Sequence, residues 1–177
     1  GRDVFSRLLF GGRISLTVGF LSLLIVFPIG LIYGGISGYY GGFLDTLMMR
    51  FAEAIMAIPS FYLLIILAAI LPSGMTSVQR FALIVVILAL IGWSGFARVV
   101  RGMVLSIKNE DFVQAEKTLG ASDLRIILKH ILPQTTSYVI IAMTLSVPSY
   151  ILAESGLSFL GLGIQQPDAS WGNMLKE

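Results

Sequence analysis

Long stretches without charged side chains alternate with short charged ones along this sequence. Four stretches contain no Asp, Glu, Lys, Arg or His: residues 14–44, 54–79, 81–97 and 131–153. A helix that spans a bilayer needs about 20 mostly apolar residues, within a range of about 17–25. The third stretch reaches this length when the long side chains of Arg80 and Arg98 extend to the polar interfaces. The pattern therefore predicts an all-α membrane protein with four spans, near residues 14–38, 51–71, 80–101 and 132–153.

A long polar segment separates the third and fourth stretches. Residues 98–130 hold six of the twelve basic residues, four of the ten acidic residues and the only histidine. We therefore expect a loop outside the membrane over 102–131, a second, outer loop over 154–177, and a tight turn at Gly38–Gly42. With four spans, the side that carries the long loop has seven Lys and Arg residues and the opposite side has five. This excess places the long loop in the cytoplasm.

Composition narrows the classes of function. Apolar residues make up 56% of the chain and charged residues 12%, about half of the roughly 25% that is typical of soluble domains. The chain has no cysteine, which excludes disulfides and thiolate metal sites. Its single histidine, His130, argues against a histidine-based metal site. The net charge of +2 is too small to indicate a nucleic-acid partner.

Glycine recurs every four residues near the end of the first expected span, at Gly30, Gly34 and Gly38, and again at Gly42. This spacing puts hydrogen-sized side chains on one helix face, so that a second helix backbone can approach closely. We interpret Gly30, Gly34 and Gly38 as helix-packing positions, with a subunit-interface or gating role as the alternative. Gly38 and Gly42 could instead make the turn that follows.

Glu53 is a carboxylate near the start of the second expected span. A carboxylate inside a membrane is a candidate for function by default. Glu53 lies only about one helical turn from the polar boundary at Arg50, however, and three residues after it. An interfacial salt bridge between the two is therefore the favoured interpretation over a substrate or proton role.

The long loop shows the pattern of a short amphipathic helix in its first half. Asn109 can cap its start. Phe112, Ala115 and Leu119 then form an apolar stripe at helical spacing. Gly120 follows the last of them, which predicts that the helix ends there in a left-handed backbone conformation.

A second short helix is predicted directly afterwards. Ser122 can cap its start, and Pro133 is expected to mark a break before the last span begins. The apolar stripe of this helix consists of Leu124, Ile127, Leu128 and Ile131. Both helices mix acids and bases on their polar faces, unlike the Lys- and Arg-rich face of helices that lie on lipid. A protein partner is therefore the favoured ligand of this loop.

The residues of this loop resemble a known signature. Ala115 and Gly120, followed thirteen residues later by Pro133 in Ile131-Leu132-Pro133, are similar to the loop motif of bacterial importer permeases, the membrane subunits of binding-protein-dependent ABC transporters. That motif reads Glu-Ala-Ala, three residues, Gly, nine residues, Ile, one residue, Leu-Pro. Other residues stand at three of its positions: Gln114, Glu116 and His130.

Segments along the whole chain resemble the dipeptide, oligopeptide and nickel branch of these permeases. They are residues 1–8, 92–102, 120–125, 154–163 and 171–175. The resemblance implies the transmembrane domain of a type I ABC importer with cytoplasmic coupling helices. Members of the branch typically have six spans, so it also implies that four of an expected six are present here, with one more before Gly1 and one more after Glu177.

The resemblance further implies which residues contact an ATPase and which proteins assemble with this chain. The residues expected to couple to an ATPase are Phe112, Ala115, Glu116, Leu119, Gly120, Ala121, Leu124, Leu132 and Pro133. The expected partners are a sister permease, two ATPase subunits, an extracytoplasmic substrate-binding protein and the lipid bilayer of the bacterial cytoplasmic membrane. The chain lacks a G-x-x-x-x-G-K-[ST] motif, so ATP and Mg are expected in the ATPase partners and no cofactor or enzymatic activity in this chain.

The expected function is that of a membrane permease subunit in an ATP-driven importer of di- or oligopeptides. A nickel or other small-solute importer of the same branch is the first alternative. A remote alternative is an intramembrane serine protease, because Gly92-Trp93-Ser94-Gly95 resembles the serine motif of rhomboid proteases and His130 could serve as a base. A passive channel would need polar residues lining a pore, and the hydroxyls near Thr135 are more typical of helix packing.

Overall fold

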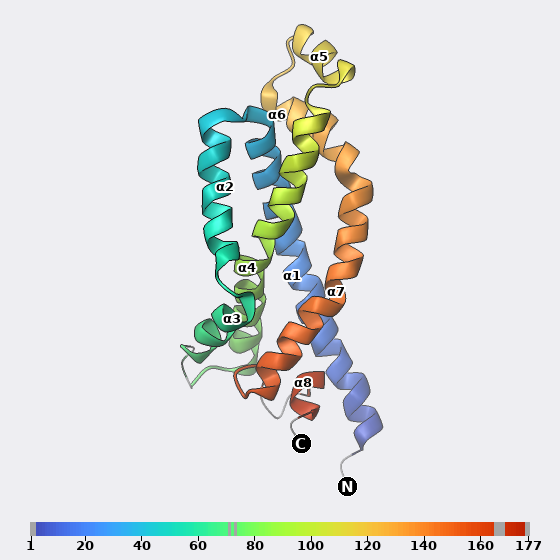
Figure 1. Ribbon diagram of the computed structural model, residues 1–177. Coiled ribbons are helices and arrows are strands. Elements are labelled where there is room, and N and C mark those ends of the chain that lie inside the picture. Colours follow the sequence, from blue (N-terminus) through green and yellow to red (C-terminus); the bar gives the residue numbers. More distant parts are fainter. Residues whose placement is uncertain (1–2, 71, 73, 165–168, 176–177) are drawn as a thin grey trace. The chain divides into compact units, whose positions relative to one another are not determined.

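The computed structural model describes residues 3–70, 72, 74–164 and 169–175, and its regular elements over those residues are helices (Figure 1). The α-helices are α1 (Val4–Tyr40), α2 (Gly42–Ala57), α3 (Ser60–Ala69), α4 (Ser77–Ile107), α5 (Asp111–Thr118), α6 (Asp123–Arg125), α7 (Thr136–Phe159) and α8 (Trp171–Met174). A π-helical turn, η1 (Ile126–Ile131), and a 3₁₀ turn, η2 (Leu132–Thr135), connect α6 to α7.

Three continuous helical segments are long and apolar enough to cross a membrane: Val4–Tyr40, Ser77–Ile107 and Asp123–Phe159. The second expected span, near 51–71, differs from a single straight helix. It is divided between α2 and α3, which are bent by 78° with respect to each other. Pro59 lies between them and explains the bend, because proline lacks the backbone N–H and disfavours helical geometry at the preceding residue. If the bent pair is one span, the described residues contain four.

Pro133 does not interrupt the helical segment Asp123–Phe159, so the predicted break before the last span is wrong. Pro133 lies in the first turn of η2, where the missing N–H of proline leaves no hydrogen bond unmade. The winding changes from π to 3₁₀ to α instead. Two threonine hydroxyls accompany the change: Thr135 Oγ1 donates to Leu132 O at 2.7 Å, and Thr136 Oγ1 donates to Pro133 O at 2.6 Å.

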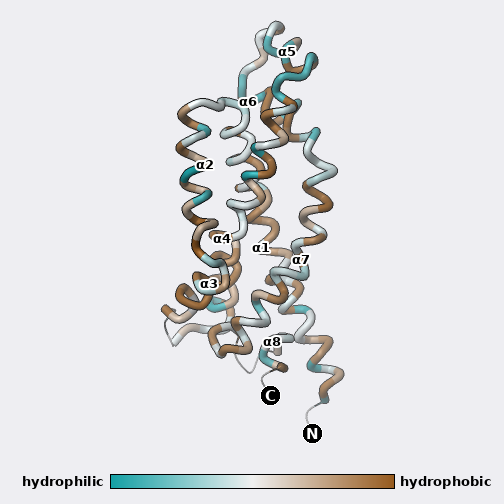
Figure 2. Tube along the Cα trace, viewed as in Figure 1, coloured by the Kyte–Doolittle hydropathy of each residue, from teal (hydrophilic) through white to brown (hydrophobic). Residues whose placement is uncertain are grey.

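The chain divides into two compact units. Unit 1 consists of Gly1–Ile25, Ile58–Ile91 and Thr144–Glu177, and unit 2 of Val26–Ala57 and Gly92–Met143. The helices α1, α4 and α7 each contribute residues to both units. Figure 2 shows apolar residues along these helices and polar residues concentrated at α5.

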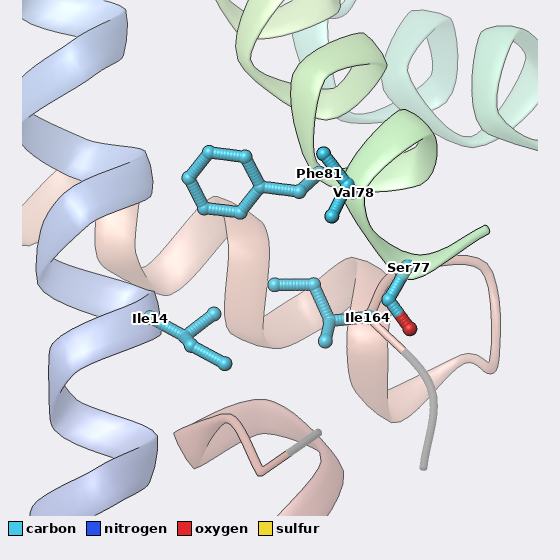
Figure 3. Close-up of a pocket in the computed structure, with 5 residues that line it drawn as sticks. All are labelled: Ile14, Ser77, Val78, Phe81 and Ile164. Atoms are coloured by element: carbon cyan, nitrogen blue, oxygen red, sulfur yellow. The ribbon is translucent and has the colours of Figure 1, made fainter. Parts of the chain in front are cut away.

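An apolar cluster forms the centre of unit 1. Its buried members come from α1, α3, α4 and α7 and from the segment after α7: Val18, Leu64, Ile84, Val85, Ile87, Leu88, Leu157 and Ile164. A hollow of about 220 Å³ lies beside it, lined by Ile14, Ser77, Val78, Phe81 and Ile164 (Figure 3). The Ser77 hydroxyl is the one polar group among these side chains, so the lining offers no charge to a polar solute.

A buried carboxylate, Glu154 on α7, organises the polar part of unit 1. Its side chain is fully buried, and each of its oxygens accepts one serine hydroxyl. Ser15 Oγ donates to Oε2 at 2.9 Å, and Ser158 Oγ donates to Oε1 at 2.6 Å. Each hydroxyl in turn accepts a backbone N–H, from Trp171 at 3.2 Å and from Ile164 at 3.1 Å respectively. The carboxylate thus ties together α1, α7, the segment after α7 and α8.

Helix α8 lies close against this network. It starts with a capping box, in which Ser170 accepts from the Asn173 N–H and the Asn173 side chain accepts from the Ser170 N–H. The Trp171 indole donates to Leu8 O of α1 at 3.0 Å. A methyl group added at Gly172 would lie 2.6 Å from Ser155 O. The expected outer loop 154–177 is therefore corrected over its described residues: α7 continues to Phe159 and α8 covers Trp171–Met174. Residues 165–168 and 176–177 of that loop lie outside the described residues.

Candidate functional site

Unit 2 brings α1 and α4 into backbone contact at the three glycines singled out in the sequence. A methyl group at Gly30 would lie 3.2 Å from Trp93 O, and one at Gly38 would lie 2.8 Å from Arg101 O. A methyl group at Gly34 would collide with Ala97 O and lie 2.9 Å from Val100 Cβ. The α4 backbone thus follows this face of α1 over three successive turns, which small residues alone permit.

Gly35, one residue along, serves another neighbour that the glycine spacing did not reveal. A methyl group there would lie 3.1 Å from Leu132 Cδ2 and 3.4 Å from Ile127 Cγ2. Leu132, expected among the coupling residues, therefore packs against α1 inside unit 2. Gly42 has a positive φ of 57° and makes the turn after α1 together with Gly41, whose φ is 68°.

An ion pair joins three helices near this turn. Asp45 of α2, which is 6% exposed, accepts Arg101 Nε at 3.0 Å and also pairs with the Arg101 terminal nitrogen. Ser37 of α1 donates its hydroxyl to the same carboxylate. The sequence pattern did not indicate this site. The available signal was the position of Asp45 directly after the first uncharged stretch and of Arg101 at the end of the third expected span, because a charge buried near a membrane requires a partner.

The ion pair that was expected on α2 is confirmed. Arg50 and Glu53, three residues apart on α2, lie 3.2 Å apart, with side chains 78% and 45% exposed. This exposure agrees with an interfacial salt bridge and leaves Glu53 outside the packed interior of unit 2.

The first helix of the loop, α5, does not begin as predicted. Asn109 was expected to cap it, but the N-cap residue is Glu110, without a side-chain capping bond. The Asn109 side chain instead donates to Leu105 O of the last turn of α4 at 3.3 Å. The Gln114 side chain donates to Lys108 O at 2.9 Å and so connects α5 to the end of α4.

The end of α5 follows the prediction. Gly120 has a φ of 78°, in the left-handed region that glycine adopts without steric cost. Its N–H donates to Lys117 O at 3.0 Å, and the N–H of Ala121 donates to Glu116 O at 3.1 Å. These two bonds form a Schellman motif, which satisfies the last carbonyls of the helix. Nothing lies within 4 Å of a methyl group placed on Gly120, so the backbone angle and not lack of space requires glycine.

The predicted apolar stripes divide between buried and exposed residues, here called the inner and the outer face. Ile127 and Ile131 are buried, together with Val113 of α5 and Ile126 of η1, which the predicted stripes did not include. The outer face carries large apolar side chains that are exposed: Phe112 at 40%, Leu119 at 81%, Leu124 at 61% and Leu128 at 49%. Among the expected coupling residues, Ala115, Gly120 and Pro133 are also exposed, and Glu116, Ala121 and Leu132 are partly buried.

Contacts between α5 and η1 fix the orientation of this outer face. Glu116 Oε1 lies 3.7 Å from His130 Nδ1, which is an ion pair when the imidazole is protonated. Val113, three residues before Glu116, is fully buried. Figure 1 shows α5 beyond the end of α4. Over the described residues, no group of three or more His, Cys, Asp or Glu side chains is arranged to hold a metal ion.

Relatives of the chain are transport permeases. It is 50% identical over its whole length to the dipeptide transport system permease protein DppC of Bacillus subtilis, of which it covers 53%. It is 46% identical to the oligopeptide transport system permease protein OppC of Haemophilus influenzae, covering 55% of that protein. It is 40% identical to the glutathione transport system permease protein GsiD of Escherichia coli O6:K15:H31, covering 56%. The chain thus spans about half the length of these relatives, and they do not favour the intramembrane protease alternative.

A family model describes most of the chain as well. Residues 17–177 match the model of the binding-protein-dependent transport system inner membrane component. The match includes α2 to α8, most of α1 and the whole loop between α4 and α7. Together with the apolar helices, it identifies an integral membrane protein. The chain belongs to the family of binding-protein-dependent transport system inner membrane components.

Proposed function

We propose that this chain is part of the membrane permease subunit of an ATP-driven importer for di- or oligopeptides in the bacterial cytoplasmic membrane. The names of the dipeptide and oligopeptide relatives support the substrate class. The permease forms half of the translocation pathway, and a sister permease forms the other half. An extracytoplasmic substrate-binding protein delivers the peptide. A nickel or small-solute importer is the runner-up, which uptake of labelled dipeptide and of ⁶³Ni²⁺ by the complete transporter distinguishes.

One observation carries the proposed coupling to ATP: the outer apolar face of the loop between α4 and α7. Phe112, Leu119, Leu124 and Leu128 expose their side chains on short helices that lie on either side of the Gly120 joint. Exposed apolar side chains concentrated on a fixed surface are typical of interaction sites. The mixed charges around them favour a protein partner over a lipid surface. We assign this face to the groove of an ATPase subunit.

The packing of unit 2 supports a mechanism for the transmission of movement. The loop is anchored on α1 where Ile127 of η1 and Leu132 of η2 lie against Gly35. The Gly30, Gly34 and Gly38 contacts then hold α1 against α4. Two ATPase subunits that close on ATP and Mg would therefore displace the loop and these helices as one body. ATP shifts the equilibrium between inward- and outward-facing states only by its differential affinity for the two.

The surroundings of α7 leave room for the sister permease and lipid. The most apolar 18-residue window of the Asp123–Phe159 segment has none of its residues buried within this chain. Large side chains such as Ile140, Leu145 and Leu152 are each 59% exposed or more. In a membrane protein such a surface requires lipid or another helix. In the proposed orientation, 102–131 is cytoplasmic and the 71–80 and 154–175 segments face outward.

Substitution of Gly120 tests the coupling. Gly120→Val should strain the left-handed joint by about 1–2 kcal/mol and turn Leu119 and Leu124 away from a common groove. Gly120→Asn is the matched control, because asparagine tolerates this conformation. In the complete transporter with full-length permease, we expect the Val variant to insert normally but to lose ATPase co-purification or peptide uptake in proteoliposomes. Normal binding and uptake by Gly120→Val would contradict the assignment.

A further inference from the structure

Tyr39, in the last turn of α1, contacts both halves of the loop between α4 and α7. Its phenol O–H donates to Asp123 Oδ1 of α6 at 2.7 Å. Its ring lies under Lys117 of α5, with the ammonium nitrogen 5.2 Å from the ring centroid. The two partners stand on opposite sides of Gly120. One aromatic side chain of α1 thus holds the helix before the joint and the helix after it.

The backbone of Tyr39 is held by a different element. Lys108, just beyond the end of α4, donates its ammonium group to Gly38 O at 2.8 Å and to Tyr39 O at 3.2 Å. These carbonyls belong to the last turn of α1 and lack partners within the helix. The positive φ of Gly41 and Gly42 then turns the chain into α2. The end of α1 is therefore fixed by α4 through its backbone and by the loop through one side chain.

The burial of Tyr39 makes its contacts with the loop energetically important. The residue is 8% exposed, and a buried phenol needs a hydrogen-bond partner. Such a requirement could be met by any nearby carbonyl. Here it is met by a carboxylate on the moving segment of the proposed mechanism, which gives a stronger, charge-assisted bond. The ring also receives a cation from the other helix of that segment, an attraction that strengthens when water is excluded.

We propose that Tyr39 is the joint through which displacement of the coupling loop reaches α1, with Asp123 and Lys117 as its two contacts on the loop. This inference rests on the proposed coupling function. Tyr39 is a positioning residue: it lies on the inner side and contributes nothing to the outer face of Phe112, Leu119, Leu124 and Leu128. Loss of its hydroxyl should therefore leave ATPase docking intact and weaken the transfer of movement.

The test compares Tyr39→Phe with Tyr40→Phe in the complete transporter with full-length permease. Both changes remove one phenol oxygen, but Tyr40 is 51% exposed. The readouts are ATPase co-purification, ATP hydrolysis and the ratio of dipeptide taken up to ATP hydrolysed. We expect Tyr39→Phe to bind ATPase normally and to lower this ratio roughly fivefold or more. Tyr40→Phe should leave the ratio unchanged.

Substitutions of Asp123 guard against a simple folding defect. Asp123→Asn keeps an oxygen that can accept the phenol proton and should retain most of the ratio, whereas Asp123→Ala should match Tyr39→Phe. The double variant Tyr39→Phe/Asp123→Ala should be no worse than either single one, because both remove the same contact. An unchanged ratio in Tyr39→Phe, or additive losses in the double variant, would overturn the proposal. Failure of the unmodified permease to bind ATPase would instead refute the proposed function itself.

Discussion

Different kinds of contact stabilise the interior of unit 1 and the interior of unit 2. Unit 1 concentrates its polar interactions on one buried carboxylate, Glu154, which two serine hydroxyls satisfy. Unit 2 is stabilised at several points along α1. Three glycines contact the α4 backbone, and the Asp45–Arg101 ion pair lies near the end of α1. A centre built around a buried charge fails when its partners are removed, because the charge is left without compensation. Repeated small contacts weaken step by step. Unit 2, which carries the loop between α4 and α7, is stabilised in the second way.

The largest effect is expected from removing both donors to Glu154. Ser15→Ala/Ser158→Ala leaves a buried carboxylate without its hydroxyl partners, and hydrogen bonds to charged groups contribute about 1.5–3 kcal/mol each. The stability should therefore fall by about 3–6 kcal/mol, measured by unfolding of the purified protein in detergent. Ser22→Ala is the matched control: Ser22 is a fully buried serine of α1 whose hydroxyl has no hydrogen-bond partner within the described structure. A similar loss in the control would show that the destabilisation does not depend on the hydrogen bonds to Glu154.

A smaller effect is expected where one glycine contact is blocked. Gly34→Ala places a methyl group against Ala97 O, and overpacking typically costs about 1–3 kcal/mol. Gly102→Ala on α4 is the control, since nothing lies within 4 Å of the added methyl and alanine favours the helix by up to about 1 kcal/mol. Gly35→Ala should fall between them, because the flexible Leu132 side chain can move. Equal thermal stability of all three variants would refute the backbone contact between α1 and α4.

The two arginine–carboxylate pairs of α2 should differ. Asp45→Asn weakens a mostly buried pair with Arg101 and should destabilise unit 2 by about 1–2 kcal/mol. Glu53→Gln changes an exposed pair and should have no more than a few tenths of a kcal/mol effect. A double-mutant cycle with Arg101→Ala isolates the coupling of the first pair. If Glu53→Gln were the more damaging change, the burial argument would be wrong.

The smallest effect on stability is expected on the outer face. Leu119→Ser alters a side chain that is 81% exposed, so unfolding should shift by no more than about 0.5 kcal/mol. Co-purification of the ATPase should nevertheless fall sharply. Leu175→Ser in unit 1, with 72% exposure in the original residue, should change neither property. Reduced ATPase binding by both variants would indicate a general surface effect and not a docking face.

Local patterns predicted the helices and one backbone angle well, and long-range contacts poorly. Gly120 was predictable because a glycine directly after an apolar stripe ends a helix in one preferred geometry. The role of Asn109 was not predictable, because its side chain donates to the Leu105 carbonyl of α4 and does not cap the helix that follows. Pro59 offered a signal for the bend in the second span, but uncharged length dominated the prediction.

The polar centres illustrate the limit more clearly. Ser15 and Glu154 are 139 positions apart in the sequence, and Asp45 and Arg101 are 56 apart. No periodicity connects such pairs, and only the packing of helices brings them together. The division of the loop stripes into buried Ile127 and exposed Leu128 was equally hidden, because both residues satisfy the same apolar pattern until a neighbour covers one of them.

Because the winding changes between α6 and α7, the loop between α4 and α7 is joined to α7 and to α1 in two different ways. In η1 the hydrogen bonds follow the wide π pattern, which underwinds the helix, and in η2 they follow the tight 3₁₀ pattern, which overwinds it. Exchange of a few hydrogen bonds between these patterns would twist α7 about its own axis without breaking the chain. The loop is thus connected to α7 through turns of changing winding, whereas the Tyr39 hydrogen bond and the Leu132–Gly35 contact hold it directly to α1. A push on the loop should translate α1 and rotate α7.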